Sequence, residues 1–327
     1  MVPDGTRLRV GTRTSRLALW QTYHVSAKLE ARWPGVRVER VPITTLGDRV
    51  TNLAISKIGD KGIFTRELED ALRAGTIDLA VHSLKDLPTE TPAGLRLGAV
   101  LEREDPRDAL VALPDATLST LPRGARVGTS SLRRRAQLAT VRQDLEIVDI
   151  RGNVPTRLDK VWRGDVNAVV LALAGLKRLG LESHVSQVFD PDELLPAPGQ
   201  GALAVQIRGD DEHMASLVAT LDHAASRVAT TAERALLGCL EGGCQVPVGA
   251  LAEFDDTGSI LLCGVVASLE GLQVIRRRAA VRVASVENAK ELGESLGREL
   301  LEAGGRDILN AIRAAPLSRA ALEESAS

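Results

Sequence analysis

A short pattern that joins a strand, a glycine turn and a helix start occurs twice in this chain and constrains its fold most strongly. Residues 10–15 (VGTRTS) lead into one helical pattern, and residues 126–131 (RVGTSS) lead into another. A second correspondence links residues 78–85 with residues 167–177. Short β-branched runs alternate with helical patterns around these motifs, which is typical of sheets covered by helices. We therefore expect two similar α/β domains, each built on a largely parallel sheet.

The first domain shows this alternation most clearly. The pattern predicts strands at residues 8–10, 36–41 and 79–81, and helices at residues 15–32 and 63–74. We expect His82, which continues the third strand, to be packed or hydrogen-bonded rather than catalytic. Residues 196–201 (PAPGQG) break the pattern, and the strand-like residues 202–207 that follow could close either sheet.

The last third of the chain has a different pattern. Helical stretches at residues 211–222 and 224–240 precede apolar runs at residues 246–254, 260–266 and 272–283, and a last helical pattern covers residues 286–303. Turn sequences separate the apolar runs, as expected of hairpins. The sequence therefore predicts a third, smaller α+β domain with a three-stranded antiparallel sheet.

Composition excludes several classes of protein. The net charge is −2 and aromatic residues make up 2%, which argues against a general nucleic-acid surface or base stacking. The 3 cysteines lack CxxC spacing and the 5 histidines are scattered, so we expect neither a disulfide scaffold nor a metal site. No apolar run approaches the roughly 20 residues that span a bilayer. The chain also starts without a signal-peptide pattern, so we expect a cytoplasmic protein that does not bind membranes.

The two helix starts are candidate anion sites, because free backbone N–H groups and a positive dipole end gather there. Arg13 and Ser15 lie at the first start; taken alone, this start favours ordinary capping with a solvated arginine. The second start is richer in charge, since residues 124–163 carry nine basic and four acidic residues. Arg133, Arg134 and Arg151 lie in this stretch, and converging guanidinium groups indicate a small polyanionic ligand. RNA is the competing ligand, disfavoured by the lack of interleaved aromatic residues.

Two further segments are candidates for chemistry. Residues 81–88 (VHSLKDLP) place Ser83, Lys85 and Asp86 beyond the carboxyl end of a strand, where open α/β sheets bind ligands. A carboxylate there can stabilise a developing cation or move a proton, although a surface Lys–Asp pair is common at such positions. The polar residues 47–62 form either a lid or a passive insertion.

Cys244 follows a glycine pair in residues 240–247 (LEGGCQVP), which predicts a thiol exposed on a turn. Because a thiolate is a strong nucleophile, such a residue can carry a covalently attached group. The alternative is a small hydrophobic residue near a turn.

These motifs together resemble the porphobilinogen deaminase (hydroxymethylbilane synthase) family over nearly the whole chain. The matching runs are residues 11–18, 61–64, 81–88, 128–134, 151–154, 198–201 and 241–247, in the family's order. Pro155 is a local difference, which a first helical turn tolerates.

The resemblance implies a transferase of porphyrin (tetrapyrrole, heme) biosynthesis. It implies a dipyrromethane cofactor joined to Cys244 by a thioether, on which four porphobilinogen molecules condense head to tail with release of ammonia, before water frees hydroxymethylbilane. It also implies two domains similar to periplasmic binding proteins and a cofactor-bearing third domain. The expected boundaries are residues 1–101 with 202–220, residues 105–197, residues 223–315, and a frayed tail at residues 316–327.

The resemblance also assigns roles to residues. Asp86 is the expected catalytic residue, and Lys61 and Phe64 are assigned to a lid. Cofactor binding is assigned to Lys85, Asp86, Thr129, Ser131, Arg133, Arg134 and Arg157. Substrate binding is assigned to Arg13, Ser15, Ser83, Arg151, Arg157, Arg178 and Gln200.

Asp86 is expected to stabilise the electrophilic azafulvene that forms when ammonia leaves the substrate. We expect porphobilinogen as the small-molecule partner, no nucleic acid, no metal and a monomer. The main alternative is a non-enzymatic receptor or sensor module that binds a small anion, because its pair of α/β domains would look the same.

Overall fold

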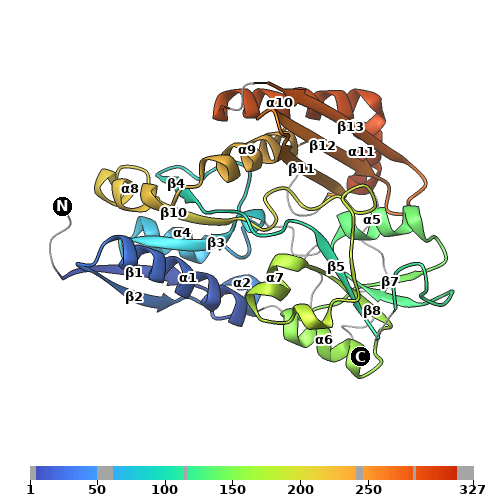
Figure 1. Cartoon of the computed structure of the whole chain (residues 1–327), viewed down its shortest axis with the longest axis horizontal. Coiled ribbons are helices and arrows are strands. Elements are labelled where there is room, and N and C mark those ends of the chain that lie inside the picture. Colours follow the sequence, from blue (N-terminus) through green and yellow to red (C-terminus); the bar gives the residue numbers. More distant parts are fainter. Residues whose placement is uncertain (1–4, 50–61, 114–115, 241–245, 283–284, 315–327) are drawn as a thin grey trace.

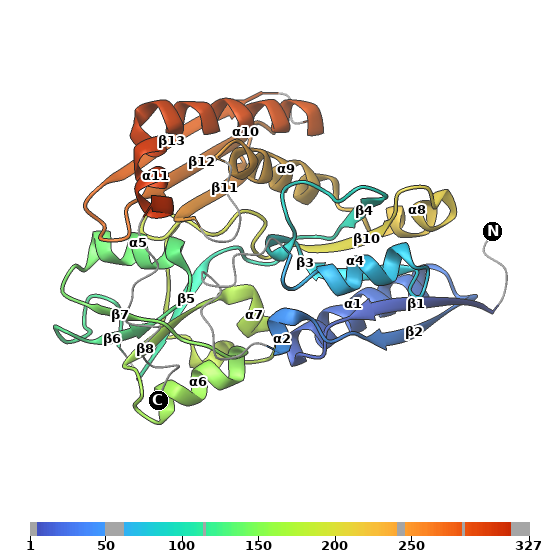
Figure 2. The same ribbon diagram turned by 180° about the vertical axis from the view of Figure 1, so that it is seen from behind.

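The computed structural model describes residues 5–49, 62–113, 116–240, 246–282 and 285–314. The chain folds into three lobes, each with its own sheet (Figure 1; Figure 2 shows the opposite side). Two lobes are five-stranded α/β units, and the third is a three-stranded antiparallel sheet with helices. The fold class expected from the sequence is therefore confirmed.

The sheet of the first lobe has the strand order β2-β1-β3-β10-β4. Its strands are β1 (Thr6–Thr12), β2 (Val36–Pro42), β3 (Leu79–Ser83), β4 (Leu95–Val100) and β10 (Leu203–Arg208). Strand β1 pairs in parallel with β2 and β3, whereas β10 runs antiparallel to both β3 and β4. The sheet is thus mixed rather than purely parallel: four strands run in one direction, as the prediction of a largely parallel sheet expects, and β10 runs against them because it returns from the second lobe.

Helices cover both faces of this sheet. Leu29 of α1 (Arg16–Arg32) and Leu217 of α8 (Glu212–Val218) belong to the apolar cluster on one face. Leu68 and Leu72 of α4 (Arg66–Arg73) belong to the cluster on the other face. Short elements complete the lobe, namely α2 (Leu46–Arg49), η1 (Leu84–Asp86) and η3 (Ala219–Leu221).

The second lobe has the strand order β7-β6-β8-β5-β9. Its strands are β5 (Asp108–Ala112), β6 (Arg126–Gly128), β7 (Glu146–Val148), β8 (Ala168–Ala172) and β9 (Gln187–Val188), and its helices are α5 (Leu132–Val141), α6 (Val154–Trp162), α7 (Leu173–Arg178) and η2 (Glu182–His184). Strand β6 is parallel to β7 and β8, and β5 is antiparallel to β8 and β9. The two α/β lobes share the parallel strands that carry the repeated glycine turn, as the sequence pattern predicted.

The third lobe consists of the sheet β11 (Val248–Phe254), β12 (Ile260–Ala267) and β13 (Val274–Val281) with the helices α9 (Ala224–Cys239), α10 (Val286–Leu300) and α11 (Arg306–Ala314). Leu236 of α9, Leu296 of α10 and Ile308 of α11 share one apolar cluster on a face of this sheet. The sequence pattern predicted one last helix, but residues 301–305 form a π-type turn with Gly304 at φ 108°, and α11 follows it. A positive φ is cheap for glycine alone, so this residue lets the chain bend between the helices.

Buried polar contacts tie the three lobes together. Glu233 of α9 is fully buried, and both of its oxygens accept hydrogen bonds from the guanidinium of Arg103, at 2.6 and 3.0 Å. The backbone N–H groups of Gly199 and Ala252 also donate to Glu233, at 2.7 and 2.9 Å. The linker, the turn that leads to β10 and strand β11 therefore meet at one carboxylate. None of the helices in the described ranges is long and apolar enough to cross a membrane.

Candidate active site

Both glycine turns place a capping serine at a helix start. Ser15 Oγ accepts a hydrogen bond from Ala18 N at 3.3 Å, and Ser131 Oγ accepts one from Arg134 N at 3.4 Å. Thr129 Oγ1 in turn accepts from Ser131 N at 3.2 Å, and Thr129 is 2% exposed. The capping alternative thus describes what these hydroxyls do in the folded chain. These capping hydrogen bonds also fix the backbone at each helix start, and with it the direction in which the neighbouring arginine side chains leave the chain.

A small pocket of about 60 Å³ lies at the carboxyl end of β3, against the start of α1. The lining residues are Arg13, Ser15, Leu17, Ala18, Gln21, Phe64, Val81, His82, Ser83 and Asp86. Five residues assigned from the sequence therefore converge on one hollow: Arg13, Ser15, Phe64, Ser83 and Asp86. This is the edge of the sheet where open α/β folds bind ligands.

The Arg13 side chain is held in place from two sides. Its Nε and Nη2 donate to the carboxylate of Asp48 at 3.2 and 2.5 Å, and its guanidinium carbon lies 4.3 Å from the centre of the Phe64 ring. Burial alone would raise the pKa of Asp48, but the hydrogen bonds and charge of Arg13 outweigh it and hold that pKa below its ordinary value. Arg13 thus already binds a carboxylate in the two-point manner that suits an acidic ligand.

Two polar residues complete the wall of the pocket. Gln21 Nε2 donates to Ser83 Oγ at 2.8 Å, which fixes the hydroxyl beside Asp86. His82 is 5% exposed, and burial lowers its pKa to about 4, so the imidazole is neutral near pH 7. It is a packed histidine, as expected from its place in the strand.

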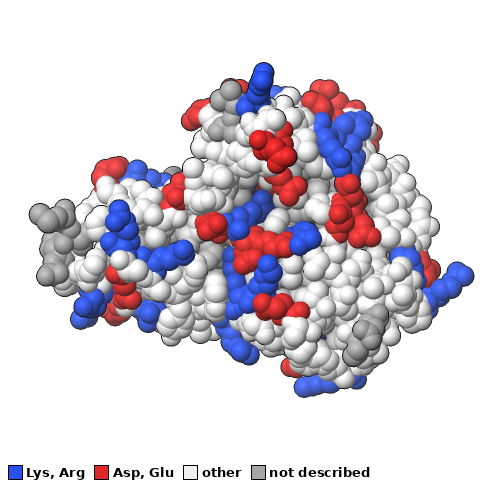
Figure 3. All heavy atoms as spheres, viewed as in Figure 1, with Lys and Arg blue, Asp and Glu red and all other residues white. Residues whose placement is uncertain are grey.

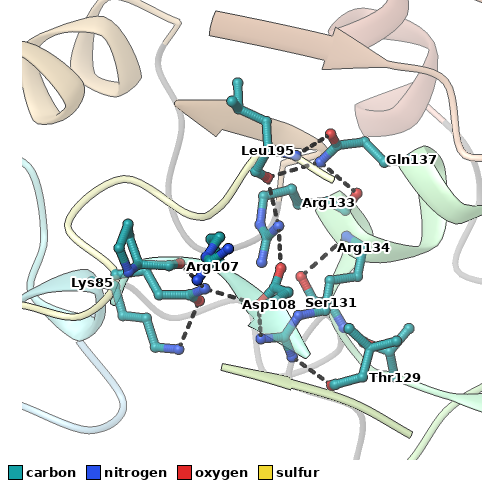
Figure 4. Close-up of polar contacts among 12 residues, drawn as sticks. Lys85, Arg107, Asp108, Thr129, Ser131, Arg133, Arg134, Gln137 and Leu195 are labelled. Atoms are coloured by element: carbon teal, nitrogen blue, oxygen red, sulfur yellow. Dashed lines mark hydrogen bonds and ion pairs between the residues drawn. The ribbon is translucent and has the colours of Figure 1, made fainter. Parts of the chain in front are cut away.

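A buried cluster of basic residues lies on the other side of η1 (Figure 4). Asp108, at the start of β5, is fully buried and lies 2.7 Å from Arg133 Nη1 and 2.7 Å from Arg134 Nη2. Arg133 Nη1 also donates to Leu195 O at 2.7 Å, and Arg134 Nη1 donates to Val170 O at 2.9 Å. The Nε atoms of both arginines are buried without a hydrogen-bond partner. Two guanidinium groups therefore share one carboxylate and keep unused donor capacity.

Gln200 links this cluster to Lys85. Its Nε2 donates to Asp108 Oδ1 at 2.8 Å and to Pro106 O at 2.7 Å, and its Oε1 accepts from Lys85 Nζ at 3.2 Å. Burial, together with the charge of Arg134, lowers the pKa of Lys85 to about 8. Gln200 is 1% exposed, so it lies inside the network between the two α/β lobes rather than at the Arg13 pocket.

Three further arginines lie around these two sites. Arg157 Nε donates to Gly152 O at 2.8 Å, and burial lowers its pKa to about 10. Arg178 Nη2 donates to Gly201 O at 2.5 Å, its guanidinium lies 5.8 Å from the Trp20 ring, and burial lowers its pKa to about 10. Burial also lowers the pKa of Arg151. Figure 3 shows basic and acidic side chains gathered near the centre of one face, where the lobes meet.

Two residues assigned from the sequence, Cys244 and Lys61, lie outside the described residues. Within the described part of the chain, the sequence analysis missed Asp108 and Gln21 as members of the site, and it placed Asp48 only in the candidate lid segment, without its contact with Arg13. Asp108 left no signal because its partners lie 25 and 26 positions away on α5. Gln21 lies inside α1, where helical periodicity predicts on which side of the helix a residue lies but does not predict its contact with Ser83.

Two family models match the chain and together cover most of it. The model described as "Porphobilinogen deaminase, dipyromethane cofactor binding domain" matches residues 8–216, and "Porphobilinogen deaminase, C-terminal domain" matches residues 228–302. The chain belongs to the porphobilinogen deaminase family. The predicted activity, its place in tetrapyrrole biosynthesis and the dipyrromethane-binding domain are therefore confirmed, and the alternative of a non-enzymatic receptor is wrong.

Curated relatives match over almost their whole length. The porphobilinogen deaminase of Moorella thermoacetica is 50% identical over 94% of this chain and 97% of its own. That of Syntrophobacter fumaroxidans is 47% identical over 93% of this chain and 97% of its own. That of a Roseiflexus species is 51% identical over 92% of this chain and 98% of its own.

Two matching solved structures are more distant from this chain in sequence. The methionine binding protein MetQ is 13% identical, with a TM-score of 0.44 over 67% of this chain and 90% of its own. The periplasmic aliphatic sulphonate binding protein SsuA from Escherichia coli is 18% identical, with a TM-score of 0.39 over 73% of this chain and 76% of its own.

The low pKa of Lys85 predicts a pH dependence of stability. Because that pKa falls from 10.5 to about 8 on folding, the unfolded chain binds more protons between these values. In the cofactor-free protein, the free energy of unfolding should therefore rise with pH through this window. Chemical unfolding at a series of pH values checks this. The rise should shrink in Lys85→Met but persist in Lys177→Met, since the ion pair with Glu104 raises the pKa of Lys177.

Proposed function

We propose that this chain joins four porphobilinogen molecules head to tail on a dipyrromethane bound to Cys244, with Asp86 as the catalytic residue. The observation that carries the proposal is the position of η1. Asp86 lines the pocket that holds Arg13, while its neighbour Lys85 contacts Gln200 in the basic cluster. A substrate held in the pocket would therefore lie beside a cofactor held by the cluster.

The donors of the basic cluster fit an acidic, two-ring cofactor. Lys85, Arg133 and Arg134 bring three positive charges to one carboxylate, Asp108, and the two buried Nε atoms have no partner. Buried donors favour an occupant that accepts hydrogen bonds and supplies negative charge. We assign these residues, with Asp86, Thr129, Ser131 and Arg157, to the dipyrromethane, whose acetate and propionate groups would meet the guanidinium groups. When bound, the dipyrromethane supplies the covalent primer to which the substrate ring is added.

The substrate is held by its own acidic groups. Arg13 already forms a two-point contact with the carboxylate of Asp48, and an acetate or propionate of porphobilinogen offers the same chemistry. We assign Arg13, Ser15, Ser83, Arg151, Arg157, Arg178 and Gln200 to the substrate and growing chain. For Gln200 the contact runs through the network that it shares with Lys85 and Asp108, because the side chain is buried.

Asp86 acts on the charge that develops during loss of ammonia. As the C–N bond of the protonated aminomethyl group of porphobilinogen breaks, ammonia leaves with the electron pair of that bond, and the positive charge of the ammonium passes to the ring and spreads to the pyrrole nitrogen. A carboxylate that accepts the pyrrole N–H stabilises this charge, and it can take up a proton when the new bond forms. Phe64 and Lys61 belong to a lid over this step in our assignment, and Phe64 supports it by stacking on Arg13.

Three coarser properties belong to the same proposal. We assign residues 1–101 with 202–220, residues 105–197 and residues 223–315 to three domains, which agrees with the placement of β10 in the first sheet. The protein acts as a monomer, since one chain supplies both the pocket and the basic cluster. It acts in the cytoplasm, where the family is typically found.

Arg133→Leu tests the assignment of the basic cluster. We expect it to remove most of the bound cofactor and to lower kcat/KM by about 10-fold to 100-fold, the usual effect of losing a charge-assisted hydrogen-bond donor in a buried site. The matched control is Arg135→Leu on the same helix, because Arg135 is exposed. Intact mass and steady-state kinetics provide the readouts. Full activity with complete cofactor in Arg133→Leu contradicts the assignment.

A further inference from the structure

Asp108 holds the two buried arginines of α5 in one arrangement. One of its oxygens lies 2.7 Å from Arg133 Nη1 and the other lies 2.7 Å from Arg134 Nη2 (Figure 4). The three side chains are 0, 4 and 6% exposed, so water does not replace any of these contacts. A single carboxylate thus sets the distance between two guanidinium groups on neighbouring residues.

The remaining contacts of the arginines leave little freedom. Arg133 Nη1 also donates to Leu195 O, and Arg134 Nη1 also donates to Val170 O, at 2.7 and 2.9 Å. These carbonyls belong to two different segments, the stretch that leads to β10 and strand β8. Each guanidinium is therefore fixed at one end by the main chain and by Asp108. The contacts with the main-chain carbonyl and with Asp108 therefore set the orientation of each Nε–H group, which has no hydrogen-bond partner.

Asp108 also reaches the first lobe. Its Oδ1 accepts from Gln200 Nε2 at 2.8 Å, and Gln200 Oε1 accepts from Lys85 Nζ at 3.2 Å. Lys85 directly precedes Asp86 in η1. One carboxylate in β5 is thereby connected to three basic groups and to the turn that carries the candidate catalytic residue.

We propose that Asp108 is a positioning residue for the dipyrromethane site, which sets Arg133, Arg134 and, through Gln200, Lys85 in the geometry that receives the cofactor's carboxylates. The inference rests on the proposed function, in which those three basic residues hold the cofactor. We assign Asp108 no contact with the cofactor, because the side chain is fully buried and faces the two arginines and Gln200.

Whether cofactor binding becomes weaker or stronger in Asp108 variants distinguishes a positioning role of Asp108 from an effect of its negative charge alone. A negative group inside an anion site repels the ligand, so removing it would strengthen cofactor binding if only the net charge mattered. Positioning predicts the opposite, because small displacements of binding groups are costly to catalysis. Asp108→Glu separates the two further, since it keeps the charge and moves the carboxylate by one methylene in a fully buried site.

The experiment compares Asp108→Glu and Asp108→Asn with the wild type on folded, monodisperse protein. Intact mass gives the fraction of chains that carry the adduct, and steady-state kinetics on adduct-bearing protein give kcat and KM. We expect both variants to carry less adduct, and kcat/KM of the remaining adduct-bearing protein to fall about 100-fold. If Asp108→Asn does not fold, Asp108→Glu decides alone, because its ion pairs remain.

Asp144→Asn is the matched control. Asp144 accepts two hydrogen bonds from Arg142, at 2.7 and 2.8 Å, at the far end of α5 from Arg133. We expect it to lower the melting temperature and to leave adduct and kcat/KM unchanged. If the Asp108 variants behave in the same way, or if they carry more adduct than the wild type, the inference is wrong. If Arg133→Leu keeps its cofactor and activity, the proposed function fails instead, so the two failures are distinguishable.

Discussion

Asp86→Asn is expected to lower kcat by about 10²-fold to 10³-fold, the usual loss when one electrostatic partner of a transition state is removed. The side chain keeps its shape and still lines the pocket with Arg13 and Ser83, so porphobilinogen should bind with a similar KM. The amide carries no charge, and it therefore cannot stabilise the positive charge that develops as ammonia leaves. Rates of ammonia release and of hydroxymethylbilane formation measure the effect.

Asp78→Asn is the control for this prediction. Asp78 precedes strand β3, at the opposite end from Asp86, and it accepts three hydrogen bonds from Arg9, at 2.8, 3.2 and 2.7 Å. Its replacement should lower stability but leave kcat near the wild-type value. Near-normal turnover in Asp86→Asn would remove Asp86 from the mechanism. Loss of the cofactor in that variant would show that the fall in kcat comes from the cofactor-binding role of Asp86, and it would contradict a direct role in the loss of ammonia.

The parts of the site that the sequence predicts are local in the chain. Ser15 and Ser131 cap helices because each follows a strand and a glycine turn within six residues, a distance over which backbone preference decides the structure. Asp86 lies at the ligand-binding edge of a sheet because three residues separate it from the end of a strand pattern. Such features can be predicted without knowing what packs against them.

The parts that the sequence did not predict depend on contacts between distant segments. Strand β10 lies between β3 and β4, and its direction follows from a linker that crosses back from the second lobe. Gly201 marks this crossing, because a Cβ at its position would collide with the carbonyl oxygen of Glu104. Asp108 pairs with arginines of another element, and Glu233 joins the third lobe to Arg103. No periodicity within either segment encodes these partners.

The charge pattern indicated the type of ligand, but it did not indicate which arginines belong to the site. The excess of basic residues at 124–163 indicated an acidic ligand; Arg133 and Arg134 are indeed buried, and Arg157 is half-buried. Arg142 belongs to the same stretch, yet it caps α5 and pairs with Asp144. Only the fold separates an arginine whose side chain pairs with a nearby carboxylate and loop carbonyls, as Arg142 does, from one that has an unpartnered Nε in a buried cluster.

Cys244→Ser is expected to abolish the covalent adduct completely. A serine hydroxyl is far less nucleophilic than a thiolate, so no thioether equivalent should form at this position. Intact mass should then show the bare chain, whereas the wild type should be heavier by two pyrrole units. Turnover should fall to background, because the primer for condensation is missing.

Cys239→Ser and Cys263→Ser are the matched controls, because both thiols are free. Burial raises the pKa of Cys239, which favours its protonated form, and Cys263, on strand β12 of the third sheet, is 9% exposed. Both variants should retain the full adduct mass. An adduct that persists in Cys244→Ser and disappears in Cys239→Ser would move the attachment site by five residues, to the end of α9. An adduct absent from the active wild type would contradict covalent priming altogether, because condensation would then proceed without an anchored chain.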